Sequence, residues 1–117
     1  MSIIKDKSFA FAVRTVNLNK HLIEVKKEYI MSKQLIRSGT AVGALVREAQ
    51  NPESIKDFIH KLAIAQKECD ESMYWLELLK ATNYLTDIEF DSMHSDATEL
   101  LKMIKSAIST SKKKLSL

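Results

Sequence analysis

From residue 34 the chain reads QLIRSGTAVGALVREAQ (34–50), NPES (51–54) and IKDFIHKLAIAQKECDESMYWLELLK (55–80). Apolar residues recur at three- and four-residue intervals in the first and third segments, which is the spacing of one face of an α-helix. Asn51-Pro52 interrupts this pattern, because proline lacks the backbone N–H that a helix interior needs. The stretch therefore predicts two helices joined by a short connection, and we expect the rest of the chain to pack against them.

Two glycines lie inside the first of these helices, one turn apart on the same side. Gly39 and Gly43 each cost about 1 kcal/mol of helix propensity relative to alanine, so their presence needs a reason. We expect a neighbouring helix backbone to approach closely there. A loop at residues 38–40 is the alternative, but it would interrupt the middle of the apolar stripe, which consists of Leu35, Ser38, Val42, Leu45, Val46 and Ala49.

The segments on either side predict two more helices. The first helix is expected over residues 8–28, followed by a link at 29–31 and by Ser32 as the N-cap of the second helix. Its expected buried face consists of Phe9, Ala12, Val13, Val16, Lys20 and Ile23, broadened by Leu18, Leu22 and Val25.

The remaining boundaries depend on capping residues. The third helix begins either with Asn51 as the cap and Pro52 as its first residue, or with Ser54 and Asp57 as a capping box. Its main stripe runs from Ile55 to Leu79. Thr86 and Glu89 form a second capping box, which opens a fourth helix that we expect to end near Ser109. Residues 110–117 lack periodicity and are predicted to be a frayed tail.

Composition agrees with an all-α fold. The 117 residues include two Gly and one Pro, with 45% hydrophobic and 28% charged residues, which favours long helices with short connections. Four helices joined by short links predict a single domain, residues 1–117, folded as an antiparallel up-down-up-down four-helix bundle. No apolar run is long enough to span a membrane, and the N-terminus lacks a signal-peptide pattern. We therefore expect a soluble, cytoplasmic protein.

Charge is distributed unevenly along the chain. Residues 1–50 contain nine Lys/Arg and four Asp/Glu, residues 51–101 contain four and eleven, and residues 102–117 contain five lysines and no acid. The net charges are thus +5, −7 and +5. This distribution allows one basic face that meets nucleic acid, with phosphate contacts expected from Lys20, Lys26, Lys27, Lys102 and Lys105. Solvated helix surface with self-complementary charge is the alternative.

The third helix has a second face that is not needed for a simple bundle. At about 100° per residue, Ile64, Glu68, Glu71, Trp75 and Leu78 gather opposite Leu62. A second stripe with the only tryptophan of the chain predicts a second burial surface, most simply another subunit. The alternative is a partly exposed tryptophan covered by the first link or by the tail.

Charged residues border this face. Arg37 and Glu48 share one flank of the second helix, separated by small alanines, and Glu68 and Glu71 border Trp75. If these flanks meet, Arg37 can pair with a carboxylate through its two-pronged guanidinium. The predicted structural or interface network is thus Arg37, Glu48, Glu68, Glu71 and Trp75, and ordinary surface charge is the alternative.

Sequence patterns that would indicate a metal site or a catalytic site are weak. Asp57-x-x-His60 and Asp91-x-x-His94 have the spacing of a di-iron motif but with Asp in place of Glu, and His60 lies far from the core stripe. Cys69 is the only cysteine and falls inside that stripe, where cysteine behaves as a small hydrophobe. We expect no catalytic residue, metal site or cofactor, and no small-molecule substrate. A metal-dependent or hydrolytic enzyme that uses Asp57, His60, Asp91 and His94 is the least favoured alternative.

The segment 34–80 resembles the four-helix-bundle proteins encoded in intervening sequences of bacterial 23S ribosomal RNA genes. The matching positions are Arg37, Ser38, Gly39, Thr40, Gly43, Ala44, Glu48, Ala49, Asp57, Phe58, Ile59, Lys61, Leu62, Ala65, Glu68, Glu71, Tyr74, Trp75 and Leu76. Leu45 departs from the family pattern, which has asparagine there. The resemblance implies a left-handed antiparallel bundle, commonly assembled as a homopentamer, and a relationship to accessory variability proteins of retroelements that bind nucleic acid. No catalytic residues come with it.

These observations lead to a functional prediction with one main rival. The prediction is a non-enzymatic homo-oligomer, a pentamer by the resemblance, that binds RNA or another nucleic acid. The rival is a protein–protein interaction scaffold in which the charges serve assembly and solubility.

Overall fold

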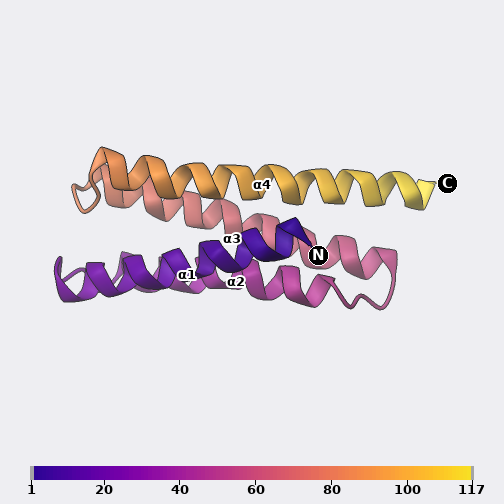
Figure 1. Ribbon diagram of the computed structural model, residues 1–117, viewed down its shortest axis with the longest axis horizontal. Coiled ribbons are helices and arrows are strands. Elements are labelled where there is room, and N and C mark those ends of the chain that lie inside the picture. The colour runs from indigo at the N-terminus through magenta and orange to yellow at the C-terminus, as the bar shows by residue number, and fades with distance from the viewer. Residues whose placement is uncertain (1, 117) are drawn as a thin grey trace.

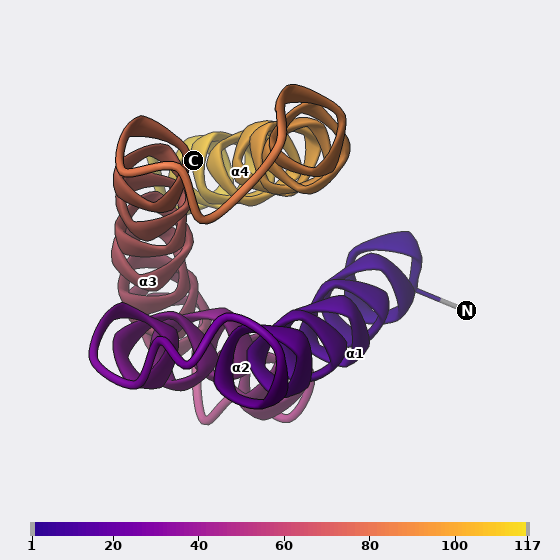
Figure 2. The same ribbon diagram turned by 90° about the vertical axis from the view of Figure 1, so that its left-hand side faces the viewer.

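The computed structural model describes residues 2–116 as four helices: α1 (Ile3–Glu24), α2 (Met31–Ala49), α3 (Ile55–Ala81) and α4 (Asp87–Ser116). Successive helices run in opposite directions along a molecule 51 Å long, as Figure 1 shows. The predicted all-α up-down-up-down bundle is therefore confirmed. Each helix packs along the next one in sequence, whereas α1 and α4 touch over a shorter stretch (Figure 2). Among the residues described, no helix is long and apolar enough to cross a membrane.

The core lies where the sequence predicts it in α2, α3 and α4. Leu35, Val42 and Val46 of α2 are at most 1% exposed. Most of the predicted stripes of α3 and α4 are buried against them, whereas Ile55, at the first turn of α3, is 43% exposed. Five members of these stripes are only partly buried against the core: Phe58, Ile59, Met73, Phe90 and Leu101. The buried members of these two stripes are Leu62, Ala65, Cys69, Leu76, Leu79, Met93, Ala97, Leu100, Ile104 and Ile108. Three of the four predicted apolar faces are thus the faces that form the core.

The main stripe predicted for α1 is wrong, although Leu18 and Leu22, which were expected to broaden it, do contact the core. Phe11, Thr15 and Leu22 are buried, whereas Phe9 is 64% and Val13 is 45% exposed. The helix has two apolar faces, and periodicity alone does not tell which of them meets the core. The choice is made by the contact with α2, which brings small and polar side chains of α1 inward.

That contact depends on the two glycines of α2, which both lie within the helix, so the alternative of a loop at residues 38–40 does not hold. A Cβ at Gly39 would lie 2.6 Å from the Oγ1 and Cγ2 atoms of Thr15. A Cβ at Gly43 would lie 3.2 Å from the backbone oxygen of Ser8. The predicted close approach of a neighbouring helix is therefore confirmed, and the neighbour is α1.

The turn between α1 and α2 is organised by Glu28 rather than by Ser32. Glu28 is 7% exposed, and its carboxylate accepts hydrogen bonds from the backbone N–H groups of Ile30, Met31 and Ser32 at 3.1, 3.1 and 2.7 Å. These are three of the N–H groups that a helix start leaves without partners. Ser32 lies inside α2, and its hydroxyl donates to the Glu28 backbone oxygen. The sequence prediction of a serine cap missed this carboxylate.

Other boundaries differ at the two ends of the chain. α1 begins at Ile3, because the Ser2 hydroxyl accepts from the Lys5 N–H, and it ends at Glu24. α4 continues to Ser116, so residues 110–116, predicted as a frayed tail, are helical, while Leu117 lies outside the described residues. Residues 110–116 keep the regular hydrogen bonding of the helix although most of them are polar. Ser111 lies on the buried side of this segment and is 9% exposed.

The caps of α3 and α4 agree with the sequence. Ser54, not Asn51, caps α3, and its hydroxyl accepts from the Asp57 N–H at 3.0 Å. The Asp57 carboxylate returns to the Glu53 N–H, one residue before the cap. At the start of α4, Thr86 and Glu89 exchange hydrogen bonds of 2.8 and 3.1 Å, so this capping box is confirmed.

Replacing Glu28 by glutamine should reveal a stability contribution that depends on pH. Burial by itself would raise the pKa of the Glu28 carboxyl, but the three backbone N–H donors outweigh it and lower the pKa below its ordinary value of 4.5. The folded state therefore keeps the carboxylate ionised where the unfolded chain binds a proton. We expect Glu28→Gln to reduce the free energy of unfolding by about 1–2 kcal/mol at pH 7.

This deficit should be constant above pH 4.5 and should shrink as the pH falls through the lower pKa of the folded protein. Urea unfolding of both proteins between pH 7 and pH 3 measures it. Glu24→Gln, at an exposed position of α1, makes the same change of side chain outside the turn and is the matched control. A deficit that persists unchanged at pH 3 would contradict the role of the ionised carboxylate.

Replacing Gly39 by alanine should destabilise the protein although alanine is the better helix former. The added Cβ would meet two atoms of Thr15 at 2.6 Å, and overpacking of this kind costs about 1–3 kcal/mol. Adding Thr15→Ala, which removes both atoms, should recover part of the loss. Thermal unfolding of the four proteins of this double-mutant cycle measures the coupling. Additive effects would show that the two helices do not meet here.

Candidate functional site

Arg37 of α2 lies between two carboxylates of α3. Its Nη1 donates to Glu68 Oε2 at 3.0 Å, and its Nη2 donates to Glu68 Oε1 at 3.2 Å and to Glu71 Oε2 at 2.6 Å. The indole N–H of Trp75 donates to the same Glu71 oxygen at 3.0 Å. Four of the five residues of the predicted network are therefore in one hydrogen-bonded group, within a single chain.

Glu48 is not part of this group. Its carboxylate accepts from the ammonium group of Lys61 on α3 at 3.1 Å, further along the same pair of helices. The sequence placed Glu48 on the flank of α2 that carries Arg37, which is correct, but three turns of helix separate the two residues. Arg37 and Glu48 on this flank of α2 therefore each pair with residues of opposite charge on α3.

The electrostatics of the group keep both signs of charge ionised. The Glu68 and Glu71 carboxylates raise the pKa of the Arg37 guanidinium above its ordinary value. Trp75 first, and then Arg37, lower the pKa of the Glu71 carboxyl, against the opposing effect of burial. The Arg37 side chain is 51% exposed, so water screens these pairs and each contributes on the order of 1 kcal/mol or less. The group positions Trp75 more than it stabilises the fold.

A buried polar contact beneath this group was missed from the sequence. The hydroxyls of Ser38 and Ser72 are fully buried and lie 2.9 Å apart, across the contact between α2 and α3. Ser38 also donates to the Leu35 backbone oxygen. Two serines at buried positions of facing helices are the signal that would have predicted this pair.

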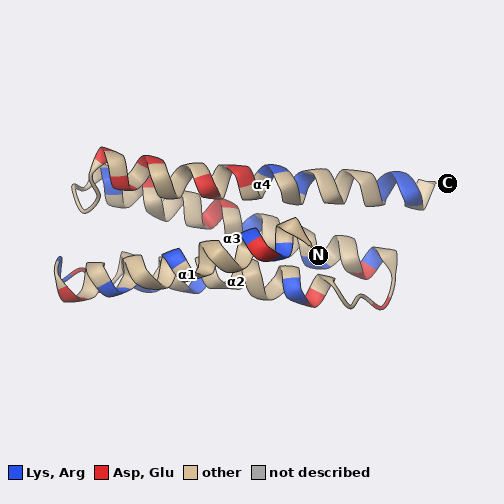
Figure 3. Ribbon diagram, in the orientation of Figure 1, with Lys and Arg blue, Asp and Glu red and all other residues tan. Residues whose placement is uncertain are grey.

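The five lysines predicted to contact nucleic acid do not form one face. Lys26 and Lys27 lie at the link between α1 and α2, and Lys20 is nearby on α1. Lys102 and Lys105 lie in the second half of α4. That half of the helix runs away from the end of the bundle where α1 and α2 are linked (Figure 3). The structure thus separates the predicted set into two groups.

Further lysines join Lys102 and Lys105. At about 100° per residue, these two and Lys112 and Lys113 fall within a sector of about 100° of α4, along about 16 Å of helix. All four are exposed. The groove beside them, between α3 and α4, is lined by Gln66, Lys105, Ile108, Ser109, Lys112, Lys113 and Ser116, and its continuation is lined by Gln66, Lys67, Asp70, Leu101 and Lys105. We refer to the four lysines of α4 as the basic strip.

The acidic residues of α4 lie in its first half and the lysines in its second half, as Figure 3 shows. Charges of these signs at these ends also complement the helix dipole, but that effect falls off within the first and last turns. Lys102 and Lys105 lie more than two turns from the end at Ser116. The helix dipole therefore does not account for half of the basic strip.

The residues of the enzyme alternative are scattered. His60 is exposed on α3, whereas His94 of α4 contacts a Glu77 carboxylate oxygen through Nε2 at 2.9 Å and stacks on Phe90. Among residues 2–116, no group of three or more His, Cys, Asp and Glu side chains is arranged to hold a metal ion. Cys69 is buried, which raises the pKa of its thiol to about 12, and it contacts the Ala97 backbone oxygen.

The fluorescence emission of Trp75 should change with pH as the Glu71 carboxyl gains or loses its proton. Trp75 is the only tryptophan, and its indole N–H donates to a carboxylate whose pKa lies below the ordinary 4.5. We expect a change in emission with a midpoint below pH 4.5 while the far-UV circular dichroism remains native. Glu71→Gln should abolish the step, and Glu77→Gln, on the side of α3 that faces α4, should leave it unchanged. A step that survives in Glu71→Gln would contradict the hydrogen bond.

Comparison with known proteins gives the family. Residues 2–106 match the family model for the 23S rRNA-intervening sequence protein. A crystal structure of a protein of unknown function, from the S23 ribosomal protein family of Bacteroides thetaiotaomicron VPI-5482, is 52% identical and has a TM-score of 0.90. The alignment covers 91% of this chain and 98% of that chain. No curated protein matches the chain. Because the family model spans most of its length, the chain belongs to the 23S rRNA-intervening sequence protein family.

Proposed function

We propose that this protein is a non-enzymatic, homo-oligomeric helical bundle that binds RNA or another nucleic acid along the second half of α4. A pentamer is the stoichiometry that the family resemblance implies. The observation that carries the proposal is the basic strip, in which Lys102, Lys105, Lys112 and Lys113 share one exposed side of a helix. No acidic residue follows Glu99 in the chain.

Phosphate recognition fits this arrangement. Lysine ammonium groups neutralise phosphates regardless of sequence, and this term supplies essentially all of non-specific affinity. Gln66, Ser109 and Ser116, which line the adjoining groove, offer neutral groups of the kind that hydrogen-bond phosphate and sugar oxygens. Among the described residues that line this groove, Asp70 is the one carboxylate, at its inner continuation. A polyanion can therefore approach the basic strip at the C-terminal half of α4, away from the acidic residues in the first half of the helix.

Assembly adds to this mechanism. Four lysines on one chain give weak, salt-sensitive binding, whereas several copies in one assembly multiply the number of phosphate contacts that a single strand can make. The proposed oligomer therefore raises affinity without any new contact within a subunit.

A protein–protein interaction scaffold is the second candidate function. It is favoured by the apolar side chains on the outside of α1, among them Phe9, which is 64% exposed. Exposed apolar surface of this kind marks interaction sites in other proteins. Capture of one specific protein partner that survives nuclease treatment, together with no nucleic-acid binding at low salt, would favour this candidate over the first.

Neutralising the basic strip should weaken nucleic-acid binding and its dependence on salt. Each phosphate contact to a single strand contributes about 0.7 to the slope of log affinity against log salt. We expect Lys102→Gln/Lys105→Gln/Lys112→Gln/Lys113→Gln to weaken binding of a fluorescent single-stranded RNA by about tenfold or more at low salt. The slope should fall by about 2–3. Fluorescence anisotropy between low and physiological salt measures both.

Lys20→Gln/Lys26→Gln is the control at the opposite end of the bundle, and it should bind nearly as well as the unmodified protein. Equal losses in the two variants would indicate a diffuse effect of net charge. No binding of the unmodified protein to RNA or DNA at low salt would refute the nucleic-acid part of the proposal.

A further inference from the structure

A pocket of about 370 Å³ lies between α1 and α2 and is lined by Lys5, Asp6, Phe9, Gly43 and Arg47. Its volume is within the range of about 300–1,000 Å³ that is typical of small-ligand pockets. Two of the five lining residues are cations, and a third, Phe9, is an aromatic side chain that is 64% exposed. The pocket therefore offers positive charge and an accessible aromatic ring at one place.

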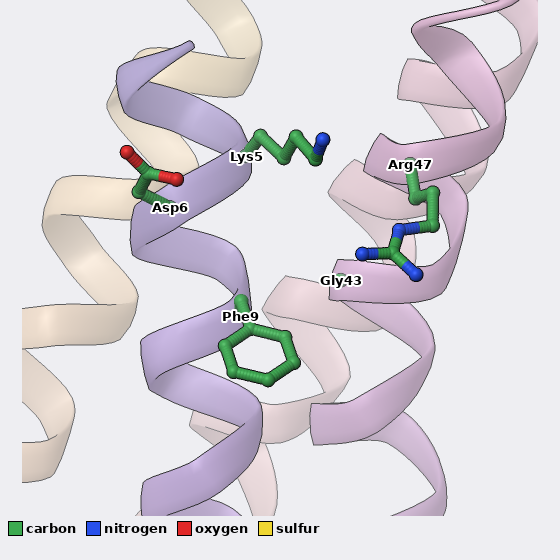
Figure 4. A pocket seen from close by; sticks show the side chains of 5 residues that line it. All are labelled: Lys5, Asp6, Phe9, Gly43 and Arg47. Atoms are coloured by element: carbon green, nitrogen blue, oxygen red, sulfur yellow. The ribbon is translucent and has the colours of Figure 1, made fainter. Parts of the chain in front are cut away.

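The close approach of α1 and α2 brings the two cations together. A Cβ added to Gly43 would lie 3.2 Å from the Ser8 backbone oxygen and 3.8 Å from the Phe9 backbone nitrogen. Lys5 lies about one turn before Phe9, and Arg47 lies about one turn after Gly43. Because the two helices run in opposite directions, these steps lead to the same level of the bundle (Figure 1). Figure 4 shows the result, with Lys5 reaching toward α2 and Arg47 turning toward Phe9.

Neither cation of the pocket has a carboxylate partner. Cations at other helix contacts are paired: Lys7 and Arg14 of α1 with carboxylates of α4, and Arg37 of α2 with carboxylates of α3. Among residues 2–116, neither Lys5 nor Arg47 lies within ion-pair distance of a carboxylate. Two like charges that face one pocket repel each other, and an anion bound between them would be attracted by both.

Asp6 does not supply the missing partner. It follows Lys5 in the chain, and at about 100° per residue it lies on a different side of α1. Figure 4 shows its carboxylate pointing away from Lys5 and Arg47. Asp6 also lines the groove between α1 and α4, which contains Lys7 and Glu99. The side of the pocket between α1 and α2 therefore keeps a net positive charge.

We infer that this pocket binds one nucleotide, with its phosphate on Lys5 and Arg47 and its base stacked on Phe9. An ammonium group and a guanidinium group both bind phosphate, and the guanidinium can do so through two parallel hydrogen bonds. Any base can stack on an aromatic side chain, because every base has a π face. Lys5 and Phe9 lie about one turn, or about 5.4 Å, apart along α1. This spacing leaves room for one sugar between the phosphate and the base.

The combination of charge and ring is what indicates a nucleotide. A simple anion would need only the two cations, and a neutral aromatic ligand would need only Phe9. A nucleotide carries both an anionic group and a planar ring, and it can come from the free pool or from the end of a nucleic-acid strand. The pocket lies on α1 and α2, apart from the basic strip on α4, so the inference does not depend on the proposed function.

Equilibrium dialysis with radiolabelled adenosine 5′-monophosphate (AMP) tests this inference. We expect saturable binding of one AMP per chain to the unmodified protein at low salt. Adenosine lacks the phosphate, and ribose 5-phosphate lacks the base. Each should therefore compete at least about fivefold less well than unlabelled AMP, because each loses either the charge-assisted hydrogen bonds or the stacking contact.

Two variants each remove one part of the pocket. Phe9→Leu keeps an apolar, helix-forming side chain but removes the ring, and it should weaken AMP binding by about fivefold or more. Lys5→Gln/Arg47→Gln removes both charges, and it should weaken AMP binding by about tenfold or more. The remaining binding of this second variant should depend little on salt. All three side chains are exposed, so circular dichroism should show native helicity for both variants.

Matched controls make the same chemical changes outside the pocket. Lys20→Gln/Lys33→Gln removes one exposed cation from α1 and one from α2, near the link between these helices. Tyr74→Leu removes an aromatic ring of α3 that is 55% exposed. Both controls, and the variant that neutralises the basic strip, should bind AMP as the unmodified protein does. A loss of AMP binding in the basic-strip variant would place the nucleotide on α4 and overturn the inference.

Three other results would also overturn the inference. The first is the absence of saturable AMP binding at low salt. The second is equal competition by ribose 5-phosphate, which would mean that the pocket recognises only an anion. The third is equal competition by adenosine, which would mean that only the ring is recognised. Loss of RNA binding in the basic-strip variant, with AMP binding intact, concerns the proposed function alone.

A 5′-phosphorylated tetra-adenylate distinguishes the two sources of the nucleotide. It is added to the basic-strip variant, so that the lysines of α4 do not contribute to binding. Displacement of AMP by this strand would show that the pocket accepts the end of a nucleic acid. AMP binding without displacement by the strand would show that the pocket takes a free nucleotide. Either result, together with the losses in the two pocket variants, supports the inference.

Discussion

The close approach of α1 and α2 is the constraint on which the rest of the structure depends. Gly39 leaves room for the Thr15 side chain, and Gly43 leaves room for the backbone at Ser8. With α1 held at these two points, its polar and small side chains face α2, and Phe11 and Leu22 complete the core. The more apolar-looking stripe is consequently turned outward. A requirement for backbone proximity has here outweighed hydrophobic periodicity in deciding which side of a helix is buried.

The parts of the fold that follow from local chemistry could be predicted from the sequence. The Ser54 and Thr86 caps, the break at Asn51-Pro52 and the core stripes of α2 to α4 each depend on residues within a few positions of one another. The buried face of α1 and the Glu28 cap could not be predicted in this way. Phe9 and Phe11 have equal claims to the core by periodicity, and Glu28 resembles any surface glutamate until the following turn folds around its carboxylate.

Some features of the candidate site could likewise be predicted from the sequence, and others could not. The pairing of Arg37 with Glu68 and Glu71 could be anticipated, because the residues lie on flanks of adjacent antiparallel helices. Lys112 and Lys113 could not be joined with Lys102 and Lys105 while the end of α4 was expected to fray, since only a continuous helix brings them into register. The basic strip lies on α4, whereas exposed apolar side chains such as Phe9 and Val13 lie on α1.

The unequal lengths of the helices have a consequence for the order in which the molecule loosens. α4 extends well beyond the start of α1, as Figure 1 shows, and it packs against α3 and α1 but not against α2. Its last turns are therefore supported by α3 alone. Segments with fewer packed neighbours open with less free energy than the global unfolding of a domain. We therefore expect amide hydrogens of these last turns to exchange with solvent before those of the central bundle. The basic strip includes residues of both the stable part and the less stable part of α4. A polyanion bound to both parts would stabilise the last turns of the helix.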